Sequence, residues 1–198
     1  MTSYPFYVDD NDPPAKRRIL EEGLRLFAER GLSSTSIRDI AASTGYSNPA
    51  LYKHFKTKEA LAVTLFVRSY KELLARMTVA LNREAGFADR FHAYVTAYTE
   101  LYDAHPHAVI FISDNLASLW PQVPNDLKKR TMITLTRELL QQGRQEGLVE
   151  KGVDLSLQVT LVIGMLSQLT RQLYLGTLAG PARTHTKEVV RILRAGLT

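Results

Sequence analysis

The sequence predicts an all-α protein in which one long helix joins a small three-helix N-terminal module to a larger helical body. Apolar residues recur at intervals of three and four along most of the chain, which is the spacing of amphipathic helices. Glycine and proline stand between these stretches, where helices begin and end. No alternating pattern indicates a strand. We expect a flexible arm at residues 1–13, the module at 14–60 and the body at 61–198.

Composition narrows the class of protein. The chain has 198 residues, enough to bury a core, and its net charge of +5 favours acidic partners only weakly. It contains no cysteine, which excludes disulfides, iron–sulfur clusters and cysteine zinc sites. No secretory signal is visible at the start, and the longest apolar run, Leu161 to Leu166, is far shorter than the ~20 residues that span a bilayer. We expect a cytoplasmic protein without a membrane partner.

The first helix is expected to follow the acidic arm. Asp12 or a neighbour can cap it, Pro13 and Pro14 fit its opening turn, and Gly31 ends it. Its buried stripe consists of Leu20, Leu24 and Phe27. From residue 16 to residue 58 the chain carries nine Lys/Arg against four Asp/Glu, which suits neutralisation of phosphates.

Residues 35–61 predict two short helices with a tight corner between them. Ser36 can cap the first helix together with Asp39, which forms a capping box. Gly45 can end that helix, because a left-handed backbone costs glycine little. The apolar residues of this helix fall on one face: Ile37, Ile40 and Ala41.

The second short helix is expected to restart at Ser47 or Asn48, with Pro49 at its first helical position. Leu51 and Phe55 lie four residues apart and should point inward. The remaining side chains are mostly hydrogen-bond donors, and no acidic residue stands between positions 39 and 59. A helix of this kind suits the major groove of DNA.

Six helices are expected beyond the corner. Thr57 can cap the long one, and the helix at 154–176 is apolar almost all round, so it is either central or covered by a partner chain. We expect the last two helices to form a dimer surface; a core within one chain is the alternative. Their expected ranges are 58–81, 87–104, 106 to about 120, 125–147, 154–176, and from a cap at Thr186 to the C-terminus.

The corner carries a set of fixed residue types at fixed offsets. They are Gly45-Tyr46-Ser47, Ala50-Leu51-Tyr52-Lys53-His54-Phe55 and Lys58-Glu59-Ala60-Leu61, preceded by Ile19-Leu20, Leu24, Leu26-Phe27, Gly31, Thr35-Ser36-Ile37 and Ile40-Ala41. In these residues the chain resembles the TetR family of bacterial transcriptional regulators, from about Arg17 to Leu61. Gly23 and Tyr46 depart mildly from the family pattern, which usually has alanine and a small aliphatic residue there.

The resemblance implies a helix-turn-helix DNA-binding module and a ligand-binding body. It implies a homodimer formed by the last two long helices and, together with the geometry of helix-turn-helix proteins, a palindromic operator with half-sites about 34–36 Å apart. In the family, a bound ligand tilts the long helix and changes the spacing of the two modules. We expect a repressor that a small apolar or aromatic effector releases from DNA. A constitutive DNA-binding dimer, or an activator, without an effector pocket is the alternative.

Candidate DNA contacts fall into two groups. For base reading, the side-chain chemistry favours Asn48, Pro49, Ala50 and Lys53, followed by Ser47 and Arg38. As phosphate contacts, the resemblance implies Thr35, Ser36, Tyr52, His54 and Lys58. His54 has a second interpretation as a core histidine. The basic residues 16–18 are either a solvated helix end or, as the family implies, a region close to the DNA backbone.

Aromatic and methionine residues of the body are candidates for an effector pocket, although such residues at helical spacing are usually core. They are Phe66, Tyr70, Phe91, Tyr94, Tyr98, Phe111, Asn115, Trp120, Met132, Met165 and Leu169. No phosphate loop, serine elbow or HExxH pair is present, and His105 and His107 lack a helical metal-ligand spacing. We therefore expect no enzyme activity, no metal and no cofactor.

Overall fold

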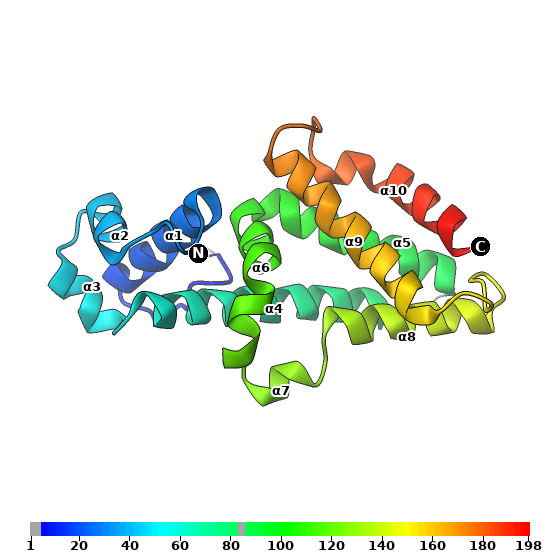
Figure 1. The fold of residues 1–198 in the computed structure, drawn as a ribbon, viewed down its shortest axis with the longest axis horizontal. Helices are drawn as coiled ribbons and strands as arrows, with labels where there is room; N and C mark the ends of the chain where they lie inside the picture. Colours follow the sequence, from blue (N-terminus) through cyan, green and yellow to red (C-terminus); the bar gives the residue numbers. More distant parts are fainter. Residues whose placement is uncertain (1–4, 83–85) are drawn as a thin grey trace. The chain divides into compact units, whose positions relative to one another are not determined.

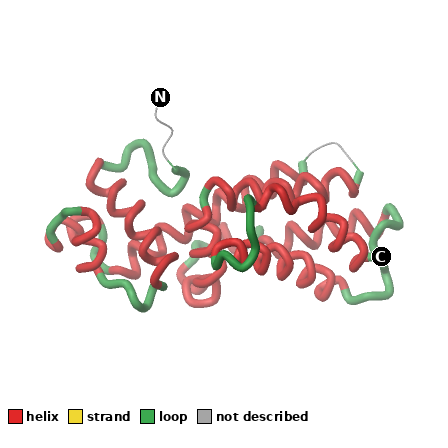
Figure 2. The backbone as a smooth tube through the Cα atoms, turned by 90° about the horizontal axis from the view of Figure 1, so that it is seen from above, coloured by secondary structure: helices red, strands yellow, loops and turns green. Residues whose placement is uncertain are grey.

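The computed structural model describes residues 5–82 and 86–198, and every regular element in that part of the chain is helical (Figures 1 and 2). The chain forms two compact units. The first contains the residues up to Glu72 together with His107–Val123, and the second contains Leu73–Pro106 and Pro124–Thr198. No helix of the described residues is long and apolar enough to cross a membrane.

Helix α1, Pro14–Arg30, follows the predicted course and ends at Gly31, whose φ of 87° lies in the region that favours glycine. Its N-cap is Pro13, and no side chain caps it. The carboxylate of Asp12 instead accepts the N–H of Asp9 (2.9 Å) and contacts the ammonium of Lys16 (2.7 Å). The arm was expected to be flexible from residue 1 to residue 13; residues 1–4 lie outside the described part, whereas Val8 and Asp12 are buried.

Helices α2, Ile37–Thr44, and α3, Asn48–His54, form the predicted pair of short helices. Helix α4, Lys58–Leu81, has the predicted bounds, and the Thr57 hydroxyl accepts the N–H of Ala60 (3.0 Å) as its cap. Because α4 starts in the first unit and ends in the second, packing divides the chain within this helix rather than at its first turn. The functional boundary near residue 60 stays a prediction.

Helix α5, Phe87–Ala104, also has the predicted bounds and belongs to the second unit. Helix α6, Pro106–Leu119, continues as a 3-10 turn, Trp120–Gln122. Apart from its first residue, α6 packs with the first unit, although the sequence predicted it as part of the body. Its buried residues include Phe111, which stacks on Phe27 of α1 with ring centroids 5.7 Å apart.

The single helix predicted at 125–147 is wrong, because the chain breaks there into two. A short turn, α7 at Asn125–Lys128, precedes helix α8 at Met132–Gln145. Thr131 caps α8: its hydroxyl accepts the N–H of Thr134 (3.2 Å), and the Thr134 hydroxyl accepts the N–H of Thr131 (2.8 Å). This reciprocal cap satisfies two backbone donors that a continuous helix would have bonded internally.

Helices α9, Leu155–Tyr174, and α10, Ala182–Leu197, complete the second unit. In it, α10 packs on α5 and α9, and α8 packs on α5 and α9. The predicted cap at Thr186 is wrong, because α10 starts one turn earlier, after Pro181. Thr186 is buried, and its hydroxyl lies 2.9 Å from that of Thr99 on α5.

Candidate nucleic-acid interface

The start of α2 is fixed by a capping box. Asp39 donates its N–H to the Ser36 hydroxyl (3.2 Å), and the Asp39 carboxylate accepts the N–H (2.7 Å) and the hydroxyl (2.6 Å) of Ser36. These hydrogen bonds hold the pKa of Asp39 below its usual value. Ile37, Ile40 and Ala41 are buried, as predicted, so the cap fixes the position from which α2 leads to the corner.

Gly45 makes the corner between α2 and α3. Its φ of 76° is left-handed, and its N–H donates to the carbonyl of Ala41 (3.0 Å). Ser47 then caps α3 by its backbone geometry and makes no side-chain cap. Asn48 is therefore the first helical residue, and Pro49 follows one position later than expected, still within the turn where a missing N–H costs nothing.

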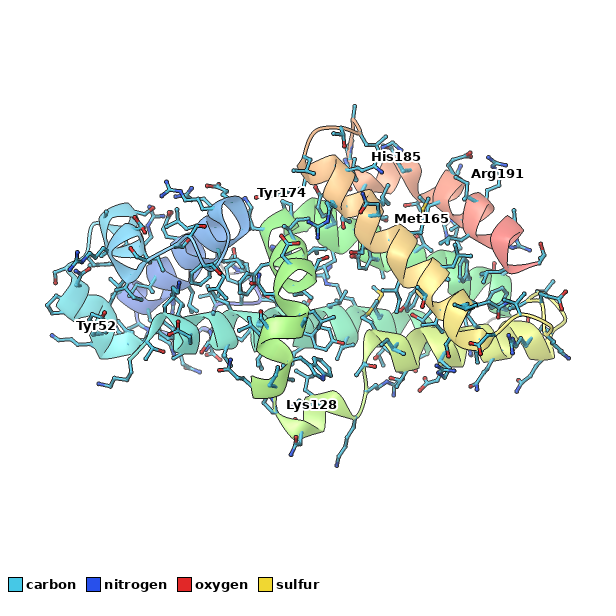
Figure 3. All side chains as sticks on the ribbon, viewed as in Figure 1. Tyr52, Lys128, Met165, Tyr174, His185 and Arg191 are labelled. Atoms are coloured by element: carbon cyan, nitrogen blue, oxygen red, sulfur yellow. The ribbon has the colours of Figure 1, made fainter. Side chains whose placement is uncertain are left out.

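Helix α3 buries one face and exposes the other. Leu51 is fully buried and Phe55 nearly so, as predicted. The ammonium of Lys16 lies 5.8 Å from the centroid of the Phe55 ring. Several candidate base and phosphate contacts are exposed, including Tyr52 with 46% of its surface, which Figure 3 labels on α3. The exposed candidates are Arg38, Ser36, Ser47, Pro49, Tyr52 and Lys53, and Asn48, Ala50, His54 and Lys58 are half-buried.

Thr35 differs from the other predicted phosphate contacts. It is 1% exposed, and its hydroxyl donates to the carbonyls of Gly31 (2.9 Å) and Leu26 (3.3 Å). The prediction that its side chain contacts phosphate is therefore not supported, because the hydroxyl is enclosed and engaged. Lys58 donates one N–H to the carbonyl of Leu32 (2.8 Å), and an ammonium group has two further donors.

The basic residues at the start of α1 form ion pairs and hydrogen bonds with other residues of the same chain. Lys16 pairs with Asp12, and Arg18 lies 3.4 Å from Glu22. Arg17 donates to the carbonyls of Asp12 and Asp10, both at 2.6 Å. A role at the DNA backbone stays a prediction for this segment.

A polar cluster that the sequence did not predict connects α1 to α2. The Ser43 hydroxyl donates to the Glu22 carboxylate (2.5 Å), and Arg25 donates to both Glu22 (2.8 Å) and Ser43 (3.0 Å). Burial acts to raise the pKa of Glu22, but the hydrogen bonds from Ser43 and Arg25 outweigh it and lower that pKa. Ser43 lies 18 and 21 residues from its two partners, so no local pattern could have revealed the cluster.

Comparison with known proteins agrees with this geometry. The family described as "Bacterial regulatory proteins, tetR family" matches residues 19–65, which span most of α1, the α2–α3 corner and the start of α4. The chain belongs to the TetR family.

Relatives match this TetR-family protein along most of its length. The HTH-type transcriptional repressor KstR2 of Mycolicibacterium smegmatis is 27% identical over 155 residues, which is 75% of each chain. The structure of the ketosteroid transcriptional regulator KstR2 of Mycobacterium tuberculosis superposes with a TM-score of 0.81 at 26% identity, over 96% of this chain and 97% of the other. FadR from Bacillus subtilis, solved in complex with stearoyl-CoA, shares the fold at 18% identity. It superposes with a TM-score of 0.74 over 92% of this chain and 100% of the other.

The predicted pocket residues of this TetR-family regulator fall in both units. In the first unit Phe66 stacks on Tyr70 (5.7 Å between centroids), and Tyr70 meets Trp120 edge-on (5.8 Å). The first-unit candidates are Phe66, Tyr70, Phe111, Asn115 and Trp120, and the second-unit candidates are Phe91, Tyr94, Tyr98, Met132, Met165 and Leu169. All are buried except Trp120 and Met165, which are half-buried. Figure 3 labels Met165 on α9.

Two of the buried tyrosines of the second unit have partners within that unit. The Tyr94 hydroxyl lies 2.7 Å from that of Thr136 and 3.8 Å from the sulfur of Met132. Burial raises the pKa of Tyr98 to about 12, against a smaller opposing effect from a hydrogen bond with Thr170. These tyrosines therefore do not require a ligand as partner, which removes one sequence argument for a cavity. In contrast, the Ser69 hydroxyl on α4 is buried without a hydrogen-bond partner among the described residues.

Proposed function

We propose that this regulator binds a palindromic operator as a homodimer, represses transcription in the bacterial cytoplasm and is released by a small apolar or aromatic effector. The observation that carries the DNA part is the exposed face of α3. Pro49, Tyr52 and Lys53 are exposed to solvent, whereas Leu51 on the same helix is buried. The helix follows α2, which has a capping box at its start and a glycine turn at its end, as in a helix-turn-helix.

Each candidate DNA contact has a role in the proposal. Asn48 and Lys53 can pair with base edges, the first with adenine and the second with guanine. Pro49 and Ala50 can contact a thymine methyl group, with Ser47 and Arg38 beside them. Tyr52, His54, Lys58 and Ser36 would hold phosphates, which sets the register without reading sequence. The Thr35 hydroxyl already bonds the carbonyls of Leu26 and Gly31, so the proposal gives its side chain no phosphate.

A dimer is supported by apolar side chains on α9 and α10. Leu157 is 64% exposed, and Leu161 and Ile192 are also exposed, although all three are large and apolar. A partner chain would cover them. Two modules related by a two-fold axis read two half-sites, which explains why one short recognition helix suffices in each.

The effector proposal rests on Ser69 and on the aromatic residues around it in sequence. A buried hydroxyl without a partner costs about 1–3 kcal/mol, which a ligand acceptor would recover. Phe66 and Tyr70 flank Ser69 on α4. The relatives bear on the class of ligand: one is named a ketosteroid regulator, and FadR was solved with stearoyl-CoA. We propose a small-molecule effector whose apolar part is of the steroid or acyl-chain kind.

Duplex selection tests the DNA part. The wild-type protein would select a binding sequence from randomised duplexes, and its dissociation constant would be measured from low to high salt. We expect a palindromic consensus and a linear fall of log affinity with log salt. Replacing Lys58 by Ala should lower the slope of that line by about one. Asn48→Ala should relax the base preference at one position of each half-site. A salt-independent affinity, or selection of no sequence, would refute the proposal.

The effector part needs a separate measurement. Stearoyl-CoA and a ketosteroid would be titrated into the complex with the selected duplex. Release of the duplex by either compound, weakened by Ser69→Ala, is the expected result. Release by neither compound, with no binding of either to the free protein, contradicts this choice of ligand class.

A further inference from the structure

A series of neighbouring polar side chains crosses the first unit from α6 to the end of α2. Hydrogen bonds join the four on α1 and α2, and the one on α6 lies 3.8 Å from the nearest of them. It consists of His107 on α6, Glu29, Arg25 and Glu22 on α1, and Ser43 on α2. We call these five residues the α6–α2 relay. None of them is among the candidate DNA contacts, so the base and phosphate interface leaves their arrangement unexplained.

The relay starts where the chain passes from the second unit into the first. α6 begins one residue after His105, which follows α5, and the second segment of the first unit begins at His107. Its Nε2 atom lies 3.8 Å from the Glu29 carboxylate at the end of α1. The stacked rings of Phe27 and Phe111 hold α1 and α6 together one turn further along. From these two contacts we expect a displacement of the start of α6 to move the end of α1.

Arg25 connects the two ends of the relay. Its guanidinium donates to Glu29 through one nitrogen (2.7 Å) and to Glu22 through two others (2.8 and 3.1 Å). A fourth hydrogen bond reaches the Ser43 hydroxyl (3.0 Å). The planar guanidinium holds both carboxylates and the hydroxyl through donors in a fixed fork; a lysine ammonium, a point charge on a flexible stem, does not reproduce this geometry.

Ser43 ends the relay two residues before Gly45. It is in the last turn of α2, where its hydroxyl donates to Glu22 (2.5 Å). The orientation of this last turn sets the direction in which the chain leaves the corner and enters α3. A shift of Glu22 and Arg25 therefore changes the placement of the recognition helix without touching any base-reading side chain.

We propose that the α6–α2 relay positions the recognition helix and transmits displacements of α6 to it. The five residues are positioning residues, because they act on DNA through the placement of α3. This proposal rests on the DNA interface proposed above and adds a route of regulation through α6 and α1, separate from α4.

A double-mutant cycle on the full-length protein tests the relay. The variants are His107→Ala, Ser43→Ala and their combination, measured for dissociation from the duplex selected by the wild-type protein. If the relay couples the two ends, the double variant should deviate from the product of the single effects by about threefold or more. The control is Ser118→Ala, an exposed change on α6, the helix that carries His107. Its effect on the dissociation constant should multiply with that of Ser43→Ala.

Arg25→Lys distinguishes the relay from general destabilisation. It preserves the charge, so the salt dependence of binding should not change. In this background the effects of His107→Ala and Ser43→Ala should become multiplicative, because the link between them is broken. Coupling that persists in the Arg25→Lys background, or single effects that multiply in the wild-type background, would overturn the proposal.

Hydrogen exchange in the free protein provides a measurement that does not depend on DNA. The amides of residues 41–45 should exchange about threefold faster in His107→Ala than in the wild type, and Ser118→Ala should leave them unchanged. Unchanged exchange in His107→Ala would overturn the relay, even if the duplex experiments support DNA binding. Faster exchange together with no selected duplex would instead refute the proposed function and retain the coupling between α6 and α2.

Discussion

At the scale of single residues, two long-range contacts define where the N-terminal segment and α8 lie. Arg68 on α4 donates to the Asp12 carboxylate (2.5 Å) and to the carbonyl of Tyr7 (3.0 Å), so it joins the segment before α1 to the long helix. Gly143 on α8 allows a close approach of Phe87 and Val149. Each contact predicts a measurable change in stability.

Asp12→Asn should destabilise the protein in a pH-dependent way. Burial acts to raise the pKa of Asp12, but the bonds from Arg68 and Lys16 outweigh it and hold that pKa well below its usual range. A carboxyl with a lowered pKa stabilises the fold above its unfolded pKa of about 3.9, and the contribution disappears as the pH falls further. We expect a loss of about 1.5–3 kcal/mol at pH 7 in urea unfolding.

The same comparison at pH 3 should give a smaller difference between Asp12→Asn and the wild type. Asp10→Asn is the matched control, because its backbone carbonyl, which accepts from Arg17, is retained. An equal loss at both pH values would contradict the assignment of the stabilisation to the ionised carboxylate.

Gly143→Ala should lower the free energy of unfolding by about 1–3 kcal/mol through overpacking. A Cβ atom at this position would lie 2.5 Å from the Val149 side chain and 2.9 Å from the Phe87 ring. Gly164→Ala is the control, since no other part of the described chain comes within 4 Å of a Cβ there, apart from the adjoining backbone of α9, and alanine should favour this helix. Urea unfolding measures the change in free energy of both variants. Equal changes would show that helix propensity, and not packing around residue 143, determines the stability effect.

At the scale of elements, the start of α8 depends on a local cap that overrides a longer helical pattern. Periodicity continues from residue 125 to residue 147, yet the helix restarts at Met132. Thr131 and Thr134 satisfy each other's backbone N–H groups at the break. A threonine pair of this kind is a weaker signal than Ser36 with Asp39, which explains why one box was predicted and the other was not.

Thr131→Ala should destabilise the protein by about 1 kcal/mol, because it removes the side-chain acceptor of the cap. Thr131→Ser retains the hydroxyl and should stay close to the wild type. Thermal unfolding followed by circular dichroism compares the two variants. If alanine and serine gave the same midpoint, the cap would contribute nothing and packing alone would start α8.

At the scale of the whole molecule, the proposed dimer makes α9 and α10 the elements on which operator binding depends. Arg191, labelled on α10 in Figure 3, pairs with Glu188 on the same helix, so the exposed charge of α10 is partly neutralised beside its apolar positions. In the proposed dimer, a second chain covers the exposed apolar residues of α9.

Leu157→Glu should therefore weaken the dimer by about tenfold or more without unfolding the chain, since burial of a carboxylate in an apolar interface is unfavourable. Sedimentation equilibrium measures the association. Val79→Glu, at a similarly exposed apolar position on α4, should leave association unchanged. A monomeric wild-type protein would remove the basis for two half-sites.

The sequence determined the features that depend on neighbours within a few residues. The capping box of Ser36 and Asp39, the left-handed turn at Gly45, and the bounds of α4 and α5 are all set locally, by side chains that bond the nearest backbone or by periodicity. For the same reason the inward positions of Leu51 and Phe55 could be predicted. The family pattern lies within this local region.

The tertiary structure alone decided which distant residues meet. Glu22 with Ser43, Arg68 with Asp12 and Thr186 with Thr99 are 21, 56 and 87 residues apart, and no periodicity encodes such a pairing. The enclosure of the Thr35 hydroxyl and the packing of α6 with the first unit have the same origin. A side chain's helix and face follow from local spacing, but its partner depends on how the whole chain packs.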